Sequence, residues 1–169
     1  MQCFIALGAN LGDPARTFEA AIAQMTCRIG ELLARSKWMQ SEPLVHPDYP
    51  SPRQPAYLNG VVALRTELDP PSVLQQLLLI ERLLGRDRAT EKQPWGPRVL
   101  DLDLIDAGGL VYSRKNLVLP HPEMHKRPFV LQPLAEIAPN WRHPTLNAGV
   151  FELLEGLAVR DEVEEEAGR

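Results

Sequence analysis

Two aspartates separated by one residue, Asp101 and Asp103, have the spacing in this sequence that most directly indicates chemistry. They lie in an otherwise apolar run from Val99 to Ile105, which predicts a β-strand. Since side chains alternate across a strand, both carboxylates point to the same face. Two unpartnered carboxylates this close repel each other, and a divalent cation removes that repulsion. Magnesium is the expected metal, because it takes carboxylate, water and phosphate oxygens as ligands.

The surroundings of the two aspartates favour a phosphate ligand over an ordinary strand surface. Taken alone, an Asp-x-Asp pair usually belongs to a solvated strand face that pairs with lysines. Here the pair follows a turn with the sequence Gly96-Pro97-Arg98, and Arg86 and Arg88 come shortly before that turn. Guanidinium groups bind phosphate oxygens through paired, charge-assisted hydrogen bonds. The arginines and carboxylates together predict a site for a metal-bound polyphosphate.

Composition predicts one globular domain. Of the 169 residues, 44% are hydrophobic and 24% are charged, which is ordinary for a domain with a proper core. We expect residues 1–160 to form the domain. Residues 161–169 are expected to form an acidic, solvated and frayed tail, because five of the six residues from 161 to 166 are acids.

Charge, hydropathy and cysteine spacing restrict the partners and the compartment. A net charge of −4 argues against a non-specific nucleic-acid binder, which would need a basic surface. Residues 1–8 lack the pattern of a secretion signal, and no apolar run approaches the roughly 18 residues of a membrane span. Cys3 and Cys27 lack the spacing of a metal site. We therefore expect a cytoplasmic protein with reduced and inert thiols, which binds neither nucleic acid nor membrane. We also expect a monomer.

Strands and helices alternate along the sequence. Apolar patterns predict strands at residues 3–7, 31–40, 58–66, 99–105 and 110–112, and helices at about 14–25, 70–84, 129–137 and 148–157. Asp13-Pro14 and Asp69-Pro70 each place an N-cap before a proline at the first helical position. The segment 41–55 holds five prolines and is predicted to be a loop. Hairpin-length turns favour an α+β fold in which helices cover one face of an antiparallel sheet.

Five sequence blocks, in the right order, then point to a family. They are Gly8-Ala-Asn-Leu-Gly12, Tyr57-Leu-Asn59, Glu81 with Leu84-Gly-Arg-Asp-Arg88, Trp95-Gly-Pro-Arg-Val-Leu-Asp-Leu-Asp103, and Leu119-Pro-His-Pro122 with Arg127-Pro-Phe129. From Phe4 to about Pro139 the chain resembles the 6-hydroxymethyl-7,8-dihydropterin pyrophosphokinases of folate biosynthesis. The resemblance implies a ferredoxin-like α+β fold. It also implies transfer of pyrophosphate from ATP to the pterin's hydroxymethyl oxygen, with two magnesium ions as cofactors and AMP as the other product.

By position, the resemblance assigns the ATP and metal end of the site to eight residues: Glu81, Arg86, Arg88, Arg98, Asp101, Asp103, His121 and Arg127. It implies that the aspartates bind both metals, that the arginines and the histidine hold phosphates, and that the glutamate contacts adenosine. The expected catalytic residues are Arg86, Arg88 and Arg98 together with the two aspartates. Taken alone, Arg86 could instead cap the preceding helix, and His121 could face water. Prolines on both sides of His121 nevertheless fix its direction.

The pterin end is assigned in the same way. Tyr57 and Phe129 match the two aromatic residues that sandwich the pterin ring, and Asn59 matches the residue that recognises its polar edge. Main-chain groups complete the edge recognition, from the segment that contains Ser41, Pro43 and Leu44. Trp95 would close over the site. Without the resemblance, the two aromatic residues would be taken for ordinary core or strand-edge side chains.

Two other classes of protein share such a fold. An RNA-recognition module would need exposed aromatic residues on its central strands, whereas only 6% of this chain is aromatic and a candidate central strand carries aspartates. A small-molecule-sensing domain without catalysis would not need the aspartates and arginines. Turnover of ATP in the presence of the pterin distinguishes the enzyme from both alternatives.

Overall fold

The computed structural model describes residues 1–44, 54–89, 91 and 96–167, with side chains up to Val159. Its centre is an antiparallel sheet in the order β2-β4-β1-β5, and the short β3 also pairs with β4. The strands are β1 (Gln2–Ala9), β2 (Glu31–Arg35), β3 (Met39–Ser41), β4 (Tyr57–Arg65) and β5 (Asp101–Ala107). A separate hairpin consists of β6 (Tyr112–Arg114) and β7 (Leu117–Leu119).

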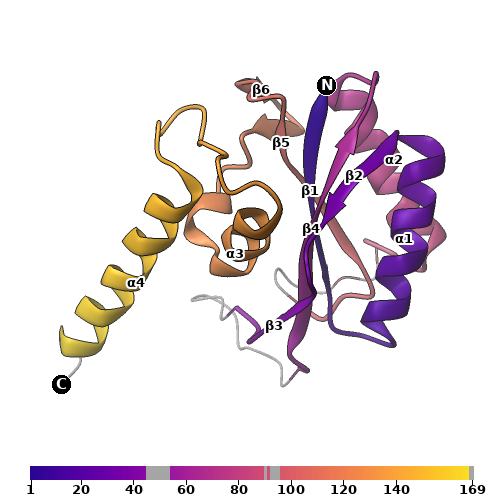
Figure 1. The fold of residues 1–169 in the computed structure, drawn as a ribbon. Helices are drawn as coiled ribbons and strands as arrows, with labels where there is room; N and C mark the ends of the chain where they lie inside the picture. The colour runs from indigo at the N-terminus through magenta and orange to yellow at the C-terminus, as the bar shows by residue number, and fades with distance from the viewer. Residues whose placement is uncertain (45–53, 90, 92–95, 168–169) are drawn as a thin grey trace.

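Helices cover both faces of this sheet (Figure 1). The helices are α1 (Pro14–Arg28), α2 (Pro70–Leu83), α3 (Pro128–Ile137) and α4 (Val150–Ala167), with a short 3-10 turn, η1 (Met124–Lys126), before α3. Helices α1 and α2 pack on one face, and α3 packs on the other with α4 outside it. The ferredoxin-like α+β class is confirmed. The prediction that helices lie on one face is wrong.

The sequence of β4 explains why both faces are covered. Its central residues Val61, Val62, Ala63 and Leu64 are all buried, so neither face of this strand can meet water. Val62 and Leu64 belong to the core under α1 and α2, whereas Val61 and Ala63 belong to the core under α3. A continuous apolar run of this kind is typical of a strand covered on both sides.

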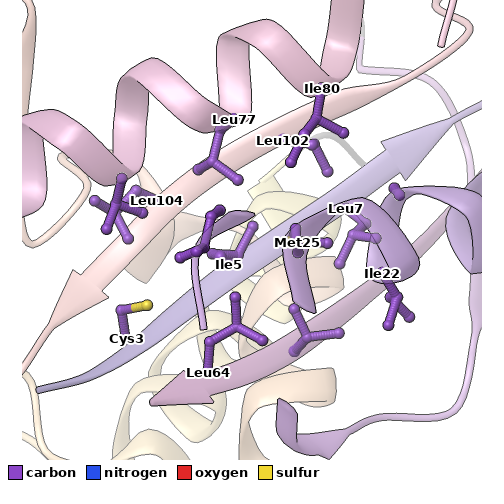
Figure 2. Close-up of a cluster of buried hydrophobic side chains, with 14 of the residues drawn as sticks. Cys3, Ile5, Leu7, Ile22, Met25, Leu64, Leu77, Ile80, Leu102 and Leu104 are labelled. Carbon is purple, nitrogen blue, oxygen red and sulfur yellow. The ribbon is translucent and has the colours of Figure 1, made fainter. Parts of the chain in front are cut away.

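The larger core lies between the sheet and the pair α1 and α2. Figure 2 shows Ile5 and Leu7 of β1 beside Leu102 of β5, with Leu77 and Ile80 of α2 above them. The first turns of α1 and α2 are capped as predicted, because Asp13 accepts a hydrogen bond from the Arg16 N–H and Asp69 accepts one from the Ser72 N–H. These local signals made the two helices predictable.

Several predicted elements have different bounds in the structure, and the second strand differs most. The strand predicted at 31–40 is divided into β2 and β3, because Ser36 interrupts it. The Ser36 hydroxyl accepts a hydrogen bond from the Val61 N–H at 3.0 Å, and the Trp38 ring packs over Gly60, where an added Cβ would lie 2.3 Å from the ring. A side chain at position 60 would therefore displace Trp38.

The strand predicted at 110–112 begins at Tyr112 in the structure and ends at Arg114.

The last helix is longer than predicted. The sequence prediction ended it at about Leu157, where the apolar positions become sparse, but the backbone of α4 remains helical to Ala167, through the acidic residues 161–166. The division of the chain after residue 160 stays a prediction. None of the helices in the described ranges is long and apolar enough to cross a membrane.

Replacing Leu77 by Ala should lower the free energy of unfolding by about 2–5 kcal/mol, because this side chain is fully buried between α2 and the sheet. Leu83→Ala on the same helix is the matched control, since Leu83 is 55% exposed and its loss should change stability by less than about 0.5 kcal/mol. Urea denaturation followed by circular dichroism measures both. Equal losses would show that the core is not where the structure places it.

Candidate active site

An open pocket lies where polar residues of β4 and β5 meet the start of α3, and the empty space in and above it is about 660 Å³. It is lined by Ala6, Leu7, Gly8, Ser41, Glu42, Leu44, Tyr57, Asn59, Arg98, Asp101, Asp103, Arg127, Phe129 and Val130. Nine of these are residues that the sequence analysis assigned to the site: Ser41, Leu44, Tyr57, Asn59, Arg98, Asp101, Asp103, Arg127 and Phe129. The fold therefore brings the expected phosphate end and the expected pterin end into one cavity.

The register of the sheet explains how the carboxylates reach this pocket. Asp101 and Asp103 on β5 lie opposite Gly8 and Ala6 on β1, and these small residues leave room above the sheet. Leu102, between the aspartates, points into the opposite core. The predicted alternation, with both carboxylates on one face, is confirmed. An alanine Cβ at position 8 would lie 3.9 Å from the Cβ of Asp101, so glycine keeps the floor of the pocket open.

Asp101 is paired on both oxygens. Its Oδ1 accepts a hydrogen bond from the Arg86 guanidinium, and its Oδ2 accepts one from Arg98 Nη1 at 2.7 Å. Burial alone would raise the pKa of Asp101, but the charges of Arg98 and Arg86 outweigh burial and hold the pKa below its usual value. Asp101 is therefore ionised at neutral pH.

Asp103 has the opposite environment. Burial, followed by the negative charge of Asp101, raises the pKa of Asp103 from 3.8 to about 7, and Arg127 only partly opposes this rise. Within the described part of the chain, Asp103 pairs with Arg127, whose Nη1 lies 3.9 Å from the Asp103 Oδ2, beyond a normal hydrogen bond. This long ion pair does not offset burial and the repulsion from Asp101.

The repulsion between Asp103 and Asp101 fits a divalent cation. Oxygen donors from one or two carboxylates, completed by water and phosphate, are what magnesium prefers. Among the described residues, no group of three or more His, Cys, Asp and Glu side chains could hold a metal ion. A metal here would take its remaining ligands from outside the protein, which suits a bound polyphosphate.

Arg86 is buried, unlike an arginine on an exposed loop. Its side chain is 3% exposed and donates to Glu81 Oε1 at 2.8 Å, to Glu91 Oε1 at 2.6 Å and to the Leu100 carbonyl at 3.2 Å, besides Asp101. The structure therefore turns this guanidinium towards carboxylates, and a contact between Arg86 and phosphate stays a prediction.

Glu81 is the buried centre of the same cluster. Its side chain is 1% exposed, and it accepts hydrogen bonds from the Leu102 N–H at 2.9 Å and from Arg88 Nη2 at 2.7 Å, besides the one from Arg86. Arg88, by contrast, is about half exposed. The carboxylate thus ties α2 to the backbone of β5, and a contact between Glu81 and adenosine stays a prediction.

The pterin end is built from β4, β3 and α3. Asn59 is buried, and its Nδ2 donates to the Ser41 hydroxyl at 2.9 Å. Phe129, in the first turn of α3, lies under the Arg127 guanidinium, 6.0 Å from it. Pro43 is described but does not line the pocket, and Trp95 lies outside the described residues.

His121 is half-buried beside this pocket and is not among its lining residues. Its N–H donates to the Ile105 carbonyl at 2.9 Å, and its Nδ1 accepts from the Glu123 N–H at 3.2 Å. Burial, with help from the Arg127 charge, lowers the pKa of His121 to about 4. The ring is therefore neutral at pH 7, and because Nδ1 accepts a hydrogen bond, the proton belongs on Nε2, which can donate.

Asn10 is a site residue that the sequence analysis did not single out. This buried side chain donates to Gln54 Oε1 at 3.0 Å and to the Pro55 carbonyl at 2.9 Å, and it accepts from the Arg98 N–H at 2.8 Å. It therefore joins the segment before β4 to the segment before β5. Asn10 follows directly after the buried strand β1, and a polar residue at such a position could have indicated a site residue.

The fold and the site together define a class. An antiparallel α+β domain with paired carboxylates, arginines and an aromatic pocket is suited to transferring a phosphate-containing group to a small heterocyclic substrate. The family model of 7,8-dihydro-6-hydroxymethylpterin-pyrophosphokinase (HPPK) matches residues 4–139.

Named relatives agree with this match. The 2-amino-4-hydroxy-6-hydroxymethyldihydropteridine pyrophosphokinase of Synechocystis sp. is 43% identical over 152 residues, which cover 89% of this chain and 73% of the relative. The enzyme of the same name from Porphyromonas gingivalis is 38% identical over 144 residues, which cover 83% and 92% of the two chains. The chain belongs to the hydroxymethyldihydropterin pyrophosphokinase family, whose members use ATP as co-substrate in folate biosynthesis.

Solved structures show the same fold. The HPPK-DHPS protein of Plasmodium falciparum, solved with pterin and p-hydroxybenzoate, matches with a TM-score of 0.77 at 14% identity. The match covers 96% of this chain but only 44% of the plasmodial chain. At this identity the likeness establishes the fold alone.

Replacing Asp103 by Asn should stabilise the metal-free protein at pH 8 and leave it unchanged near pH 4. A carboxyl whose folded pKa is raised to about 7 binds more protons in the folded than in the unfolded state, so wild-type stability falls as the pH rises from about 4 to 7. The variant lacks this penalty. Melting temperatures at pH 4.5, 6 and 8 without divalent ions measure it, with Glu31→Gln as the exposed control. Parallel profiles for wild type and Asp103→Asn would contradict the assignment.

Proposed function

We propose that this pocket transfers pyrophosphate from ATP to the hydroxymethyl group of 6-hydroxymethyl-7,8-dihydropterin, giving AMP and the pterin diphosphate. The observation that carries the proposal is that two carboxylates and two arginines share a single cavity with an aromatic pair and a buried asparagine. A phosphate chain and a flat heterocycle can therefore meet side by side. The pterin oxygen forms a bond to the β-phosphorus, and the bond from that phosphorus to the α–β bridging oxygen breaks.

The aromatic pair and Asn59 hold the pterin in this proposal. Tyr57 and Phe129 both line the cavity and supply apolar surfaces for the two faces of the ring. Because Asn59 uses its Nδ2 to bind Ser41, its Oδ1 is directed to accept from the N–H groups of the pterin edge. Anchoring by Ser41 fixes the orientation of the amide before the substrate arrives.

Two magnesium ions, held by Asp101 and Asp103, complete the phosphate end of the proposal. Bound magnesium would neutralise charge on the phosphate oxygens as the transfer proceeds. Asp103 fits this role because burial and the charge of Asp101 disfavour its ionised form, which a cation would stabilise. Asp101 could give up its hydrogen bond from Arg86 and bind a cation through Oδ1, because Arg86 would keep its ion pairs with Glu81 and Glu91.

The arginines act on the phosphates. When Asp101 binds a cation, the Arg98 guanidinium is free to turn from the Asp101 Oδ2 to a phosphate oxygen. Arg127 lies between Asp103 and Phe129, at the border between the phosphate and pterin ends, and can contact the transferred group. Arg88 is half exposed and can reach the nucleotide from the rim, whereas Arg86 acts by holding Asp101.

The setting of the reaction is also part of the proposal. We infer that the chain works as a monomer in the cytoplasm on small-molecule substrates, without a nucleic-acid or membrane partner. Its net charge of −4 supports the absence of a nucleic-acid partner. Its free cysteines, a buried Cys3 and an exposed Cys27, support a reducing compartment.

Phosphorus NMR of the wild-type protein with ATP, magnesium and 6-hydroxymethyl-7,8-dihydropterin tests the reaction. We expect AMP and a pterin diphosphate in equal amounts. A kinase that attacks the γ-phosphorus would release ADP instead. ADP together with a pterin monophosphate would therefore reject pyrophosphoryl transfer, even if each binding residue were assigned correctly.

Replacing Asp103 by Ala should reduce turnover by roughly a thousandfold or more, because the charge that a metal supplies in the transition state is worth several kcal/mol. The fold should survive, since the nearest ion-pair partner of Asp103 is 3.9 Å away. Asp101→Ala should lose as much activity and also some stability, because it removes a partner of the buried Arg86.

Steady-state AMP formation and urea denaturation measure these two effects. Glu31→Ala is the control, because this exposed carboxylate pairs with Arg65 outside the pocket. Near-normal turnover with unchanged magnesium dependence in either aspartate variant would show that the metal assignment is wrong.

A further inference from the structure

The hydroxyl group of Tyr57 has no role in stacking on a pterin. Stacking needs only an aromatic ring, and Phe129 supplies the other face of the pocket without a hydroxyl. The Tyr57 Oη instead donates to the Gly96 carbonyl at 2.7 Å, across 39 positions of the sequence. Tyr57 is half-buried and Gly96 is buried, so water competes little for this bond. The hydroxyl therefore connects the pterin wall to another segment of the site.

That segment carries Arg98. Gly96 lies two residues before it, and the Arg98 backbone is held from the other side by Asn10. The Arg98 carbonyl accepts from the N–H groups of Asn10 at 3.0 Å and Leu11 at 3.2 Å. The turn after β1 thus fixes one end of this short stretch, and Tyr57 fixes the other from the strand that binds the pterin.

The Arg98 guanidinium must be placed accurately, because its hydrogen bonds depend on short distances. Arg98 Nη1 donates to Asp101 Oδ2 at 2.7 Å, and both residues line the cavity beside Tyr57. In the function proposed above, this arginine must meet a phosphate oxygen. A small displacement of its backbone would be carried through to the charged group, and loss of alignment lowers rates more than binding.

We propose that the Tyr57 hydroxyl is a positioning group for pyrophosphoryl transfer, holding Arg98 in register through the Gly96 carbonyl while the ring of the same residue binds the pterin. The inference rests on the proposed function. It gives one side chain two separable parts, a ring that affects pterin affinity and a hydroxyl that affects turnover.

Tyr57→Phe separates the two parts. We expect its kcat to fall about three- to tenfold, as one lost hydrogen bond allows, while its Kd for the pterin stays within about twofold of wild type. Its Tm should fall by no more than about 2–4 °C. Tyr57→Ala should weaken pterin binding as well, because it also removes the ring.

A structural readout accompanies the kinetics. Amide hydrogen exchange in the ligand-free protein should become faster in the peptide that covers residues 96–100 of Tyr57→Phe, and remain unchanged elsewhere. Phe129→Ala should weaken pterin binding without changing exchange at 96–100. Tyr112→Phe is the matched control, since this half-buried tyrosine of β6 lies outside the cavity, and its kcat, Kd and exchange should equal those of wild type.

Several outcomes would overturn the inference. Unchanged kcat in Tyr57→Phe, beside an active wild type, rejects the positioning role alone. A loss of pterin affinity as large as in Tyr57→Ala shows that the hydroxyl contacts the pterin instead. Faster exchange throughout the protein shows that the bond only stabilises the fold. A wild type that forms no AMP rejects the proposed function, whereas the exchange result still reports whether the hydroxyl holds residues 96–100.

Discussion

The buried guanidinium of Arg86 is the interaction on which the phosphate end of the site depends. It connects the end of α2, through Glu81, to the start of β5, through Asp101 and the Leu100 carbonyl. Burying an arginine among carboxylates costs desolvation free energy. Such clusters therefore often add little net stability compared with apolar packing. Here every charge has a partner of opposite sign in fixed geometry, so the cluster determines position. It holds Asp101 in the lining of the pocket, and Glu81 in turn accepts from the Leu102 N–H of the same strand.

This cluster also makes the two neighbouring aspartates chemically different. Asp101 receives two guanidinium groups, which keep its pKa low, whereas burial and the charge of Asp101 raise that of Asp103. Two identical side chains on one strand face therefore have opposite pKa shifts, set by their surroundings. One carboxylate is already fixed in place before any ligand binds. In the part of the chain that the structure describes, the other has only a long ion pair with Arg127, and a cation bound with a phosphate chain would stabilise its ionised form.

What could be predicted from the sequence was set by short-range rules. Alternation placed both aspartates on one face, and Asp13 and Asp69 marked the starts of two helices, because these effects act within a few residues. The family resemblance added the aromatic pair. Features that depend on distant segments were missed. The burial of Arg86 requires α2 and β5 to be adjacent, and the bridge made by Asn10 requires two other segments to meet it. The division of the second predicted strand follows from the Ser36 hydroxyl, which binds a backbone group of β4. The continuous apolar run of β4, by contrast, is a short-range signal that both faces of the sheet are covered.

The central position of β1 sets the separation between Asn59 on β4 and Asp101 on β5. Asn59 of β4, Gly8 of β1 and Asp101 of β5 lie in one row across the sheet, because each outer residue is the register partner of the glycine. Neighbouring antiparallel strands are about 4.8 Å apart, so the outer two residues are separated by roughly 10 Å. In the proposed function, that span would suit a two-ring heterocycle with its polar edge at Asn59 and its hydroxymethyl group towards the carboxylates. The glycine in the middle leaves the floor of the pocket open, because an alanine there would place a Cβ 3.8 Å from Asn59 Oδ1. The sheet itself therefore sets the distance between Asn59 and Asp101. Tyr57 lies two residues before Asn59 on the same strand, and its hydroxyl donates to the Gly96 carbonyl, in the segment that leads to Arg98.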